Sequence, residues 1–388
     1  MEQSRSRYAS WIALVLSALL LAAVMMLCIS QNQAQAVEAA PDAQATQVFT
    51  GTITAGDQEA ALPAASATPA KKAGKASKYA LLEKNGKVYP CNKKGKKLSA
   101  TWKGGTTFNY LMVAPNVTKI PKQFNYKYVG FSGVKMKLKS VTFMLKGGKN
   151  ACKTIVANNP LGDQTALKTL KNFNKTKVTS IGKYGLAGTG ITSITLPKTL
   201  TKLGEGAFAY CKKLTKVVFP ASLKSVGKNA FRGDAKLKTL SKFGKTKVTS
   251  IGMDAFGETG ITAIALPKTL KTIGVEAFAA TKKLKTVSGL ASTKVTAIGK
   301  AAFYESGVTT LALPASCKSI GYAAFCDCAA LNSLSMPSAT LVTGSGDMLT
   351  GTVMQNNPAS ATIKVPAALA DQYKAATYWS DYADCITS

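Results

Sequence analysis

This sequence of 388 residues contains no histidine and only three arginines, Arg5, Arg7 and Arg232. The absence of histidine removes the commonest general base and the commonest metal ligand together. Mechanisms built on Ser-His-Asp, on Cys-His or on histidine-bound zinc are therefore excluded. Acidic residues are also scarce, with 18 against 50 basic residues, and the formal net charge is +32.

Lysine supplies nearly all of the positive charge, because the 50 basic residues include only those three arginines. Proteins that read nucleic acid use bidentate arginine and stacking aromatic residues, and both are scarce here. Lysine is a solvated point charge that suits diffuse attraction to polyanions. The composition favours a soluble lysine-coated surface, or docking to an anionic wall polymer or membrane surface. Specific nucleic-acid binding is not expected.

The N-terminus has the order of a secretory signal peptide. Arg5 and Arg7 precede an uncharged apolar run from Trp11 to Ile29, and a small-residue A-x-A site ends at Ala36. We expect residues 1–36 to be a signal peptide, or a signal anchor, because the run approaches the ~18 residues that span a bilayer. Residues 37–78 are expected to be a disordered linker. The protein should therefore be secreted or held at the cell surface, and should contact a membrane only through an uncleaved N-terminal segment.

A repeat of 23 or 24 residues occupies the second half of the chain. The phrase KTKVTSIG at residues 175–182 returns at residues 245–252, and ITSITLPKTL from Ile191 returns as ITAIALPKTL from Ile261. Both echoes span 70 residues, which is three units, and copying of a three-unit block explains them best. Consecutive units begin at Leu167, Ile191, Leu214, Leu237, Ile261, Leu284, Val308 and Leu331.

Each 23-residue unit has apolar residues at positions 1, 4, 6, 10, 13 and 18, proline at 7, glycine at 14 and Ala-Phe at 17 and 18. In the 24-residue units the proline is missing and one residue is inserted. We expect a strand over positions 1–6, ended by proline, which cannot donate to a ladder. A second short strand should cover positions 10–13, and Ala-Phe should form a short helical turn. Because one unit cannot bury its own apolar face, the units should stack in parallel around a phenylalanine ladder.

The motif L-x-x-I-x-L-P-x-x-L-x-x-[LI]-G-x-x-A-F-x-x-C resembles the BspA-like leucine-rich repeat of exported proteins from bacteria and some protists. Residues 167–336 carry it in seven consecutive units, and residues 108–124 and 138–143 resemble degenerate units. Residues 361–386 resemble the closing segment of such proteins, where a strand ends in Val-Pro and a helix with tyrosine and tryptophan covers the core.

The predicted fold is a right-handed leucine-rich-repeat solenoid of short parallel β-strands and short helical turns, with a C-terminal helical cap. Its predicted parts are an N-terminal cap with degenerate repeats over residues 79–166, the leucine-rich repeats over 167–336 and the C-terminal cap over 337–388. The resemblance implies a bacterial extracytoplasmic location.

The resemblance also implies binding of macromolecules without catalysis, such as adhesion to a protein or glycan of a host or neighbouring cell. The alternative is a structural wall-associated protein held to anionic cell-wall polymers by lysine-rich edges. No cofactor or metal is expected. Acidic residues in the repeats are sparse and unaligned, so no paired-carboxylate glycosidase is indicated.

Two sets of residues are the predicted binding candidates. Positions 2, 3 and 5 of the first strand should form a flat, charge-poor solvent face, which is either an idle β surface or a partner-binding sheet. Its candidates are Thr192, Ser193, Thr195, Thr215, Lys216, Thr239, Thr262, Thr286, Thr309 and Thr310. Lysines near unit junctions should form rows along the edges of the solenoid. The candidates for contact with a polyanion are Lys212, Lys213, Lys282 and Lys283.

Eight cysteines occur, and the seven that would follow signal cleavage cannot all pair within one chain. Cys211 and Cys328 occupy position 21 of their units and Cys317 takes a leucine position, so these side chains should be small buried apolar groups. Cys211 and Cys328 are roughly 24 Å apart at about 4.8 Å per unit, too far for a disulfide. Any pair would involve Cys317, Cys326, Cys328 or Cys385.

Overall fold

The computed structural model describes residues 78–84, 86–98, 107–122, 135–158, 161–345 and 362–388. The chain divides into two compact parts, Met1–Lys71 and Lys72–Ser388, and all described residues belong to the second. The predicted signal segment and almost all of the predicted linker lie outside the described residues. Within the described residues, no helix has the length and apolar character needed to cross a membrane.

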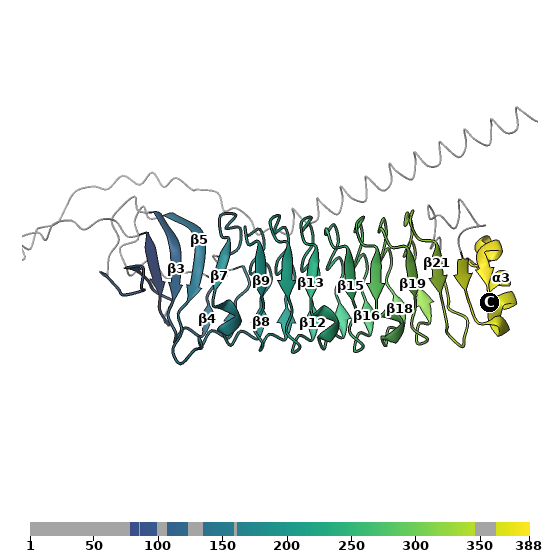
Figure 1. Ribbon diagram of the computed structural model, residues 1–388, viewed down its shortest axis with the longest axis horizontal. Coiled ribbons are helices and arrows are strands. Elements are labelled where there is room, and N and C mark those ends of the chain that lie inside the picture. The colour runs from purple at the N-terminus through teal and green to yellow at the C-terminus, as the bar shows by residue number, and fades with distance from the viewer. Residues whose placement is uncertain (1–77, 85, 99–106, 123–134, 159–160, 346–361) are drawn as a thin grey trace, which may run out of the picture. The chain divides into compact units, whose positions relative to one another are not determined.

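The repeats form a solenoid of stacked coils (Figure 1), and one side of it is an unbroken parallel sheet of nine strands. Each strand has two residues, and the second residue is buried. In spatial order the strands are β4 (Lys119–Ile120), β6 (Thr154–Ile155), β8 (Ser180–Ile181), β10 (Lys202–Leu203), β12 (Ser225–Val226), β14 (Ser250–Ile251), β16 (Thr272–Ile273), β18 (Ala297–Ile298) and β20 (Ser319–Ile320). This confirms the predicted second strand of each unit and shows that both degenerate units join the same stack.

The first strand of each unit lies on a second side, the strand face, but its ladder is divided into blocks. The strands are β7 (Thr169–Lys171), β9 (Ser193–Thr195), β11 (Lys216–Val218), β13 (Thr239–Ser241), β15 (Ala263–Ala265), β17 (Thr286–Ser288), β19 (Thr310–Ala312) and β21 (Ser333–Ser335). The blocks join β9 to β13, β15 to β17 and β19 onward, so breaks follow β7, β13 and β17. The three strands that precede a break belong to the 24-residue units.

Each break coincides with a 3-10 helix that follows the strand. These helices are η1 (Phe173–Lys175), η2 (Phe243–Lys245) and η3 (Leu290–Ser292), and each begins after a left-handed residue, namely Asn172, Lys242 or Gly289. Compared with a 23-residue unit, each of these units has two more residues between its first strand and the next buried valine. It has one residue fewer between the phenylalanine position and the end of the unit. The longer and the shorter corner both flank the strand face, which explains why only that face is interrupted.

The prediction of a helical turn at Ala-Phe is wrong. The Ala-Phe residues lie on the third side of the solenoid, which we call the turn side. The chain there forms consecutive turns in which the residues two before and two after each ladder phenylalanine are left-handed, for example Asp254 and Glu258 around Phe256. The alternation turns every second N–H toward the next coil. The N–H of Phe208 therefore donates to the Ala230 carbonyl at 2.8 Å, and that of Phe231 to the Ala255 carbonyl at 2.9 Å. A helix would direct these donors along its own axis.

The phenylalanine ladder is confirmed as the centre of the core. Five successive stacked pairs run from Phe208 to Phe325 with centroid distances between 5.1 and 5.7 Å. Phe219 and Phe243 form a second aromatic column 5.0 Å apart, with rings edge-on to the ladder. All of these rings are buried, so each coil supplies an apolar layer that only its neighbours can cover.

The glycine that directly follows the second strand of each repeat unit, at position 14 in the 23-residue units, is required by the closeness of the coils. A Cβ at Gly227 would lie 2.7 Å from the Gly204 carbonyl carbon, and a Cβ at Gly252 would lie 2.6 Å from that of Gly227. Real Cβ atoms do not approach backbone so closely, so a side chain here would separate adjacent coils. The close spacing of the coils from β8 onward therefore depends on this glycine column.

Both ends of the solenoid are closed by other structure. At the N-terminal end, the strands β1 (Tyr79–Leu82), β2 (Val88–Cys91), β3 (Thr107–Val113) and β5 (Lys135–Phe143) pair with β7 in the order β2-β1-β3-β5-β7. At the C-terminal end, β22 (Thr362–Lys364) and β23 (Ile386–Thr387) extend the last block, with η4 (Ala367–Leu369), α3 (Ala370–Ala375) and η5 (Ser380–Cys385) between them. The indole of Trp379 is buried against Tyr373 and donates to the Val342 carbonyl at 2.8 Å.

Candidate partner-binding face

The predicted partner-binding residues lie on the strand face and point toward solvent. Nine of the ten are exposed, and Thr309 is half-buried. Two of the hydroxyl groups serve the stack as well: Thr215 donates to the Thr192 carbonyl at 2.9 Å, and Thr309 to the Lys285 carbonyl at 3.4 Å. The side chains at positions 3 and 5, such as Ser193 and Thr195, are therefore more available to a partner than those at position 2.

At the breaks in the strand face, apolar side chains that were predicted to lie in the core are partly exposed. Position 4 is buried in the 23-residue units, with Ile194 at 7% and Val217 at 0% exposure. Its counterparts Leu170, Leu240 and Val287 in the 24-residue units are half-buried. The 24-residue unit length could have predicted this exposure, because it identifies the units after which the ladder of the strand face is interrupted. The strand face thus carries three apolar spots among hydroxyl groups.

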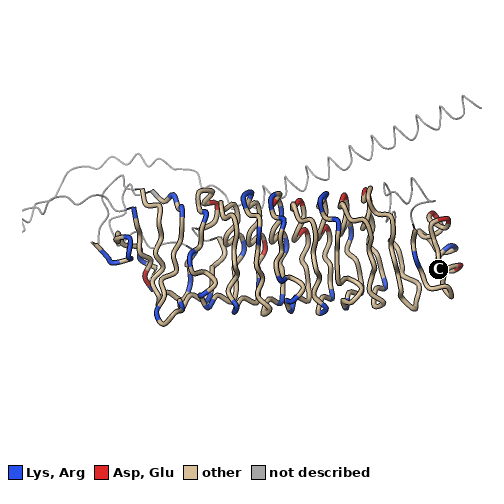
Figure 2. Tube along the Cα trace, viewed as in Figure 1, with Lys and Arg blue, Asp and Glu red and all other residues tan. Residues whose placement is uncertain are grey.

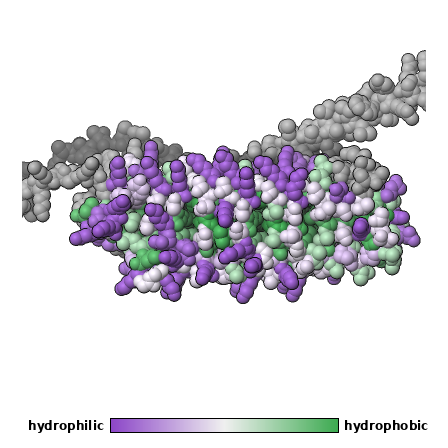
Figure 3. Space-filling view, viewed as in Figure 1, coloured by the Kyte–Doolittle hydropathy of each residue, from purple (hydrophilic) through white to green (hydrophobic). Residues whose placement is uncertain are grey.

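A hollow of about 360 Å³ opens at the first break, between β7, β9 and β11. Leu170 and Asn174 line one side, and Ser193, Thr195 and Lys216 line the other. Three of the predicted partner-binding residues are therefore brought together around an apolar side chain and an amide. In the view of Figure 3, hydrophilic residues gather along the upper and lower edges, and a paler band with apolar patches runs between them.

The repeat geometry agrees with a known family. A family model described as the BspA type leucine rich repeat region matches residues 163–248 and 249–356, in six copies. The chain belongs to the BspA type leucine-rich-repeat family. No curated protein sequence matches the chain significantly.

Solved structures of bacterial leucine-rich-repeat proteins are also similar to this chain. A leucine-rich cell surface protein of Faecalibacterium prausnitzii is 15% identical, with 73% of this chain and 95% of that chain covered and a TM-score of 0.35. A leucine-rich repeat protein of Bacteroides ovatus is 18% identical, with 72% and 83% covered and a TM-score of 0.31. The pneumococcal vaccine antigen PcpA is 16% identical, with 74% and 89% covered and a TM-score of 0.31. The family assignment depends on the repeat match alone.

The lysines of the BspA type repeats lie along the long edges of the solenoid (Figure 2). The four polyanion candidates Lys212, Lys213, Lys282 and Lys283 are all exposed at the corner that leads into the next strand. Lys282 forms an ion pair with Glu305 at 2.9 Å. The 24-residue units lack this corner pair of lysines, so the row is discontinuous.

The acidic residues are aligned, contrary to the expectation from sequence. All seven in residues 167–336 lie on the turn side of the solenoid. Asp254 and Glu276 each lie two residues before the ladder phenylalanine, whereas Glu258, Glu305 and Asp327 lie two residues after it. The unequal unit lengths hid this register. The turn side therefore carries the negative charge of the repeats.

Arg232 joins two of these acidic positions. Its guanidinium forms ion pairs with Asp254 and, at 2.9 Å, with Glu258. Burial raises the pKa of Asp254 to about 7, although Arg232 acts in the opposite direction. These carboxylates are held in ion pairs between coils. Among the described residues, no acidic and cysteine side chains gather in a way that would hold a metal ion.

The residues that lie three positions after the ladder phenylalanine, or after Leu186 in the first unit, form a buried polar column beside the ladder. Its members are Thr189, Cys211, Asp234, Thr259, Thr281, Ser306 and Cys328. Most of them donate to the carbonyl three residues earlier or to one in the preceding coil, as Thr281 does to Phe278 at 2.6 Å and the Cys328 thiol to Phe303 at 2.9 Å. Cys211, Cys317 and Cys328 are buried thiols, which confirms their predicted structural role.

Proposed function

We propose that this protein is an exported binding protein that uses the strand face of its solenoid to attach to a macromolecule on another cell. The partner is a protein or glycan of a host or neighbouring cell, and the protein acts at the cell surface or after secretion. Catalysis is not part of the proposal, since the chain lacks histidine and the side chains of Asp254, Glu258 and Glu305 are held in ion pairs with Arg232 or Lys282.

One observation carries this proposal: each 24-residue unit places a half-buried apolar side chain beside a gap in a charge-poor, hydroxyl-rich face. Interfaces combine apolar anchors in recesses with a polar rim that excludes water. Leu170, Leu240 and Val287 would be the anchors, and Ser193, Thr195 and Thr239 would belong to the rim. The backbone of the face is held by the ladders on both other sides, so little ordering would be needed on binding.

The experiment compares two charge-matched double variants of the full chain. Thr195→Glu with Thr239→Glu alters the strand face, and Thr272→Glu with Thr296→Glu alters exposed positions at the nine-stranded sheet. Labelled protein is bound to epithelial cells and to bacterial cells. We expect the strand-face variant to lose about tenfold in affinity, because carboxylates would be desolvated at the interface. Equal binding by the two variants would overturn the proposal.

The lysine rows favour a second candidate, in which the protein is a structural component bound to anionic wall polymers. The four exposed corner lysines Lys212, Lys213, Lys282 and Lys283 support it. Salt of about 0.5–1 M shortens the Debye length to 3–4 Å and should then strip the protein from cells. Retention in salt would sink this candidate and leave the strand face as the binding surface.

A further inference from the structure

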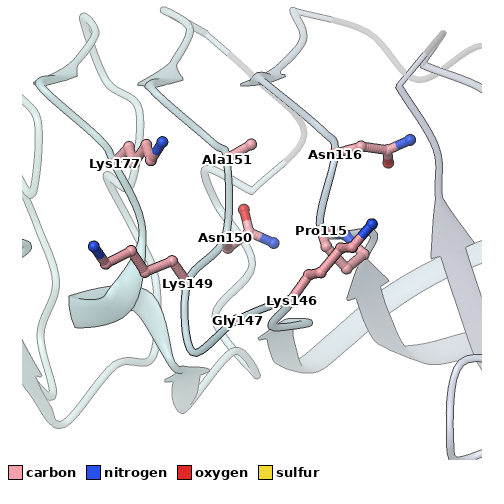
Figure 4. A pocket seen from close by; sticks show the side chains of 8 residues that line it. All are labelled: Pro115, Asn116, Lys146, Gly147, Lys149, Asn150, Ala151 and Lys177. Carbon is pink, nitrogen blue, oxygen red and sulfur yellow. The ribbon is translucent and has the colours of Figure 1, made fainter.

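A second hollow lies where the N-terminal sheet meets the first repeats, away from the strand face. It has a volume of about 500 Å³ and is lined by Asn116, Lys146, Lys149, Asn150, Ala151 and Lys177, among others. Figure 4 shows Lys149 and Lys177 on one side of it, Lys146 and Asn116 on the other, and Asn150 between them. None of the described residues that line it is acidic.

The hollow exists because a small residue lies between two longer ones. Asn116, Ala151 and Lys177 each precede by four residues an inward isoleucine of β4, β6 or β8, and these strands are paired in register. The three side chains are therefore neighbours in one column of successive coils. The methyl group of Ala151 leaves a recess between the amide of Asn116 and the ammonium of Lys177.

The floor of the hollow is held by a buried amide. Asn150 is 1% exposed, and its Nδ2 donates to the Met144 carbonyl at 2.8 Å and to the Ala114 carbonyl at 3.2 Å. Its Oδ1 accepts from the Cys152 N–H at 3.0 Å. This side chain ties the ends of β3 and β5 to the coil that carries Ala151, so the shape of the hollow does not depend on a ligand.

Two of the lysines are presented by a tight turn. Gly147 and Gly148 both have positive φ, 57° and 75°, and paired hydrogen bonds of 2.9 and 3.2 Å join Lys146 to Lys149 across the turn. Left-handed φ at two successive residues is what glycine permits. The backbones from which both ammonium groups extend are thereby fixed at the rim.

We propose that this hollow binds a phosphate or sulfate group of an anionic polymer. Among the described residues, Lys146, Lys149 and Lys177 have no ion-pair partner. Ammonium groups act as point charges and suit a tetrahedral oxyanion approached from several sides, whereas planar carboxylates are matched by the arginine fork. Asn116 adds an amide donor at the same rim. The site is separate from the strand face and from the corner lysines.

The test uses the full chain and two variants of the hollow. Ala151→Trp fills the recess without changing charge, and Lys146→Gln with Lys149→Gln and Lys177→Gln removes three charges. The control, Lys318→Gln with Lys364→Gln and Lys374→Gln, removes the same charge from exposed positions near the C-terminal end. Binding of inorganic polyphosphate, dextran sulfate and polyglutamate is measured by calorimetry, with thermal melting to verify folding.

We expect one polyphosphate or dextran sulfate site per chain that the C-terminal control variant retains within about twofold. Both hollow variants should bind about tenfold more weakly, since each contact made is a charge-assisted hydrogen bond, and the binding should weaken with salt. The stronger of the two polymers identifies the group. Equal loss in both triple variants, unchanged binding by Ala151→Trp, or tightest binding of polyglutamate would overturn the proposal. The strand-face variants should bind like the wild type, so failure here leaves the proposed function untouched.

Discussion

The two sheets of the solenoid use the same coils, yet one is unbroken over nine strands and the other is divided at every 24-residue unit. In the nine-stranded sheet each coil contributes two residues, and from β8 onward a glycine directly follows them. On the strand face the connection after the strand varies in length. The difference shows that the stack is held in register by one side, so that the other side can accept insertions.

Hydroxyl groups at position 9 of several units add hydrogen bonds between neighbouring coils. In the units that follow a 24-residue unit, the position 9 hydroxyl groups of Thr199, Thr269 and Ser316 donate to the carbonyl of Val178, Val248 and Val295 at 2.7 to 2.8 Å. These bonds satisfy a backbone acceptor at each irregular corner. Ser222, in a unit that follows a 23-residue unit, donates in the same way to the Leu200 carbonyl at 2.6 Å, so regular and irregular corners share this bond.

The largest expected difference comes from making the same substitution, glycine to alanine, once beside each of the two sheets. Gly227→Ala places a methyl group 2.7 to 2.9 Å from backbone atoms of the preceding coil. Overpacking against backbone that cannot move should lower the free energy of unfolding by about 3 kcal/mol. Gly244→Ala in η2 meets mainly the Ala265 methyl group at 3.0 Å, and should cost about 1 kcal/mol. Urea unfolding measures both.

If both variants lost the same stability, the strand face would be as tightly constrained as the nine-stranded sheet. The comparison between the sheets would then be wrong. Gly147→Ala is a control for the backbone alone, since its φ is 57° and no atom lies within 4 Å of the added Cβ.

The next effect concerns the turn side, where Asp234 interrupts the polar column. Asp234 is fully buried, and its Oδ1 accepts from the Cys211 N–H at 2.7 Å, but its Oδ2 has no partner. Burial raises the pKa of Asp234 well above its ordinary value. Asp234→Thr should copy Thr259 and Thr281, whose hydroxyls bond the carbonyl three residues earlier, and should add about 1–3 kcal/mol at pH 7.

The pH dependence of that variant gives a second check. Because the pKa of Asp234 is higher in the folded state than in the unfolded state, its contribution to stability is fully present below the unfolded pKa. That contribution is lost as pH rises through the folded pKa. The advantage of Asp234→Thr should therefore be small near pH 4 and grow toward pH 8, as thermal melting over this range would record. A gain that did not change with pH would exclude ionisation as its cause.

The smallest expected effect comes from removing one of the position 9 hydroxyl groups. Thr269→Val removes the hydroxyl that donates to the Val248 carbonyl at 2.8 Å, and should cost about 1 kcal/mol. Thr262→Val, at an exposed position of the same unit, should change stability by less than about 0.5 kcal/mol. Equilibrium unfolding of the pair measures the difference, and equal stability would mean that water satisfies the carbonyl just as well.

The sequence was sufficient to predict the fold because the repeat period, proline, glycine and Ala-Phe positions all have direct consequences for stacking. The buried phenylalanines, the parallel strands and the buried Cys211 followed from position within the unit. The prediction of a helical turn around Phe256 was wrong, because left-handed residues such as Asp254 and Glu258 produce no characteristic spacing of apolar residues in the sequence. The alignment of the acidic residues was missed because one residue lost after the phenylalanine shifts their spacing.

The candidate site was predictable only in part. Exposure of Ser193 and Thr195 follows from the alternation of a strand. The exposure of Leu170, by contrast, depends on how the chain after β7 leaves the ladder, which is a property of the corner rather than of the strand. The hollow at Ala151 likewise requires knowledge of which residues of distant coils are neighbours.

The glycine column has a consequence for how such a chain can lengthen. Since every coil from β8 to β20 offers the same glycine-lined edge to the next, a block of these coils can be copied and inserted without a new joint. Both copies of the 70-residue echo begin with an irregular coil, which carries η1 in the first copy and η2 in the second. Duplication of a block would therefore also duplicate its gap on the strand face, so that recombination alone can reset the spacing of the anchors.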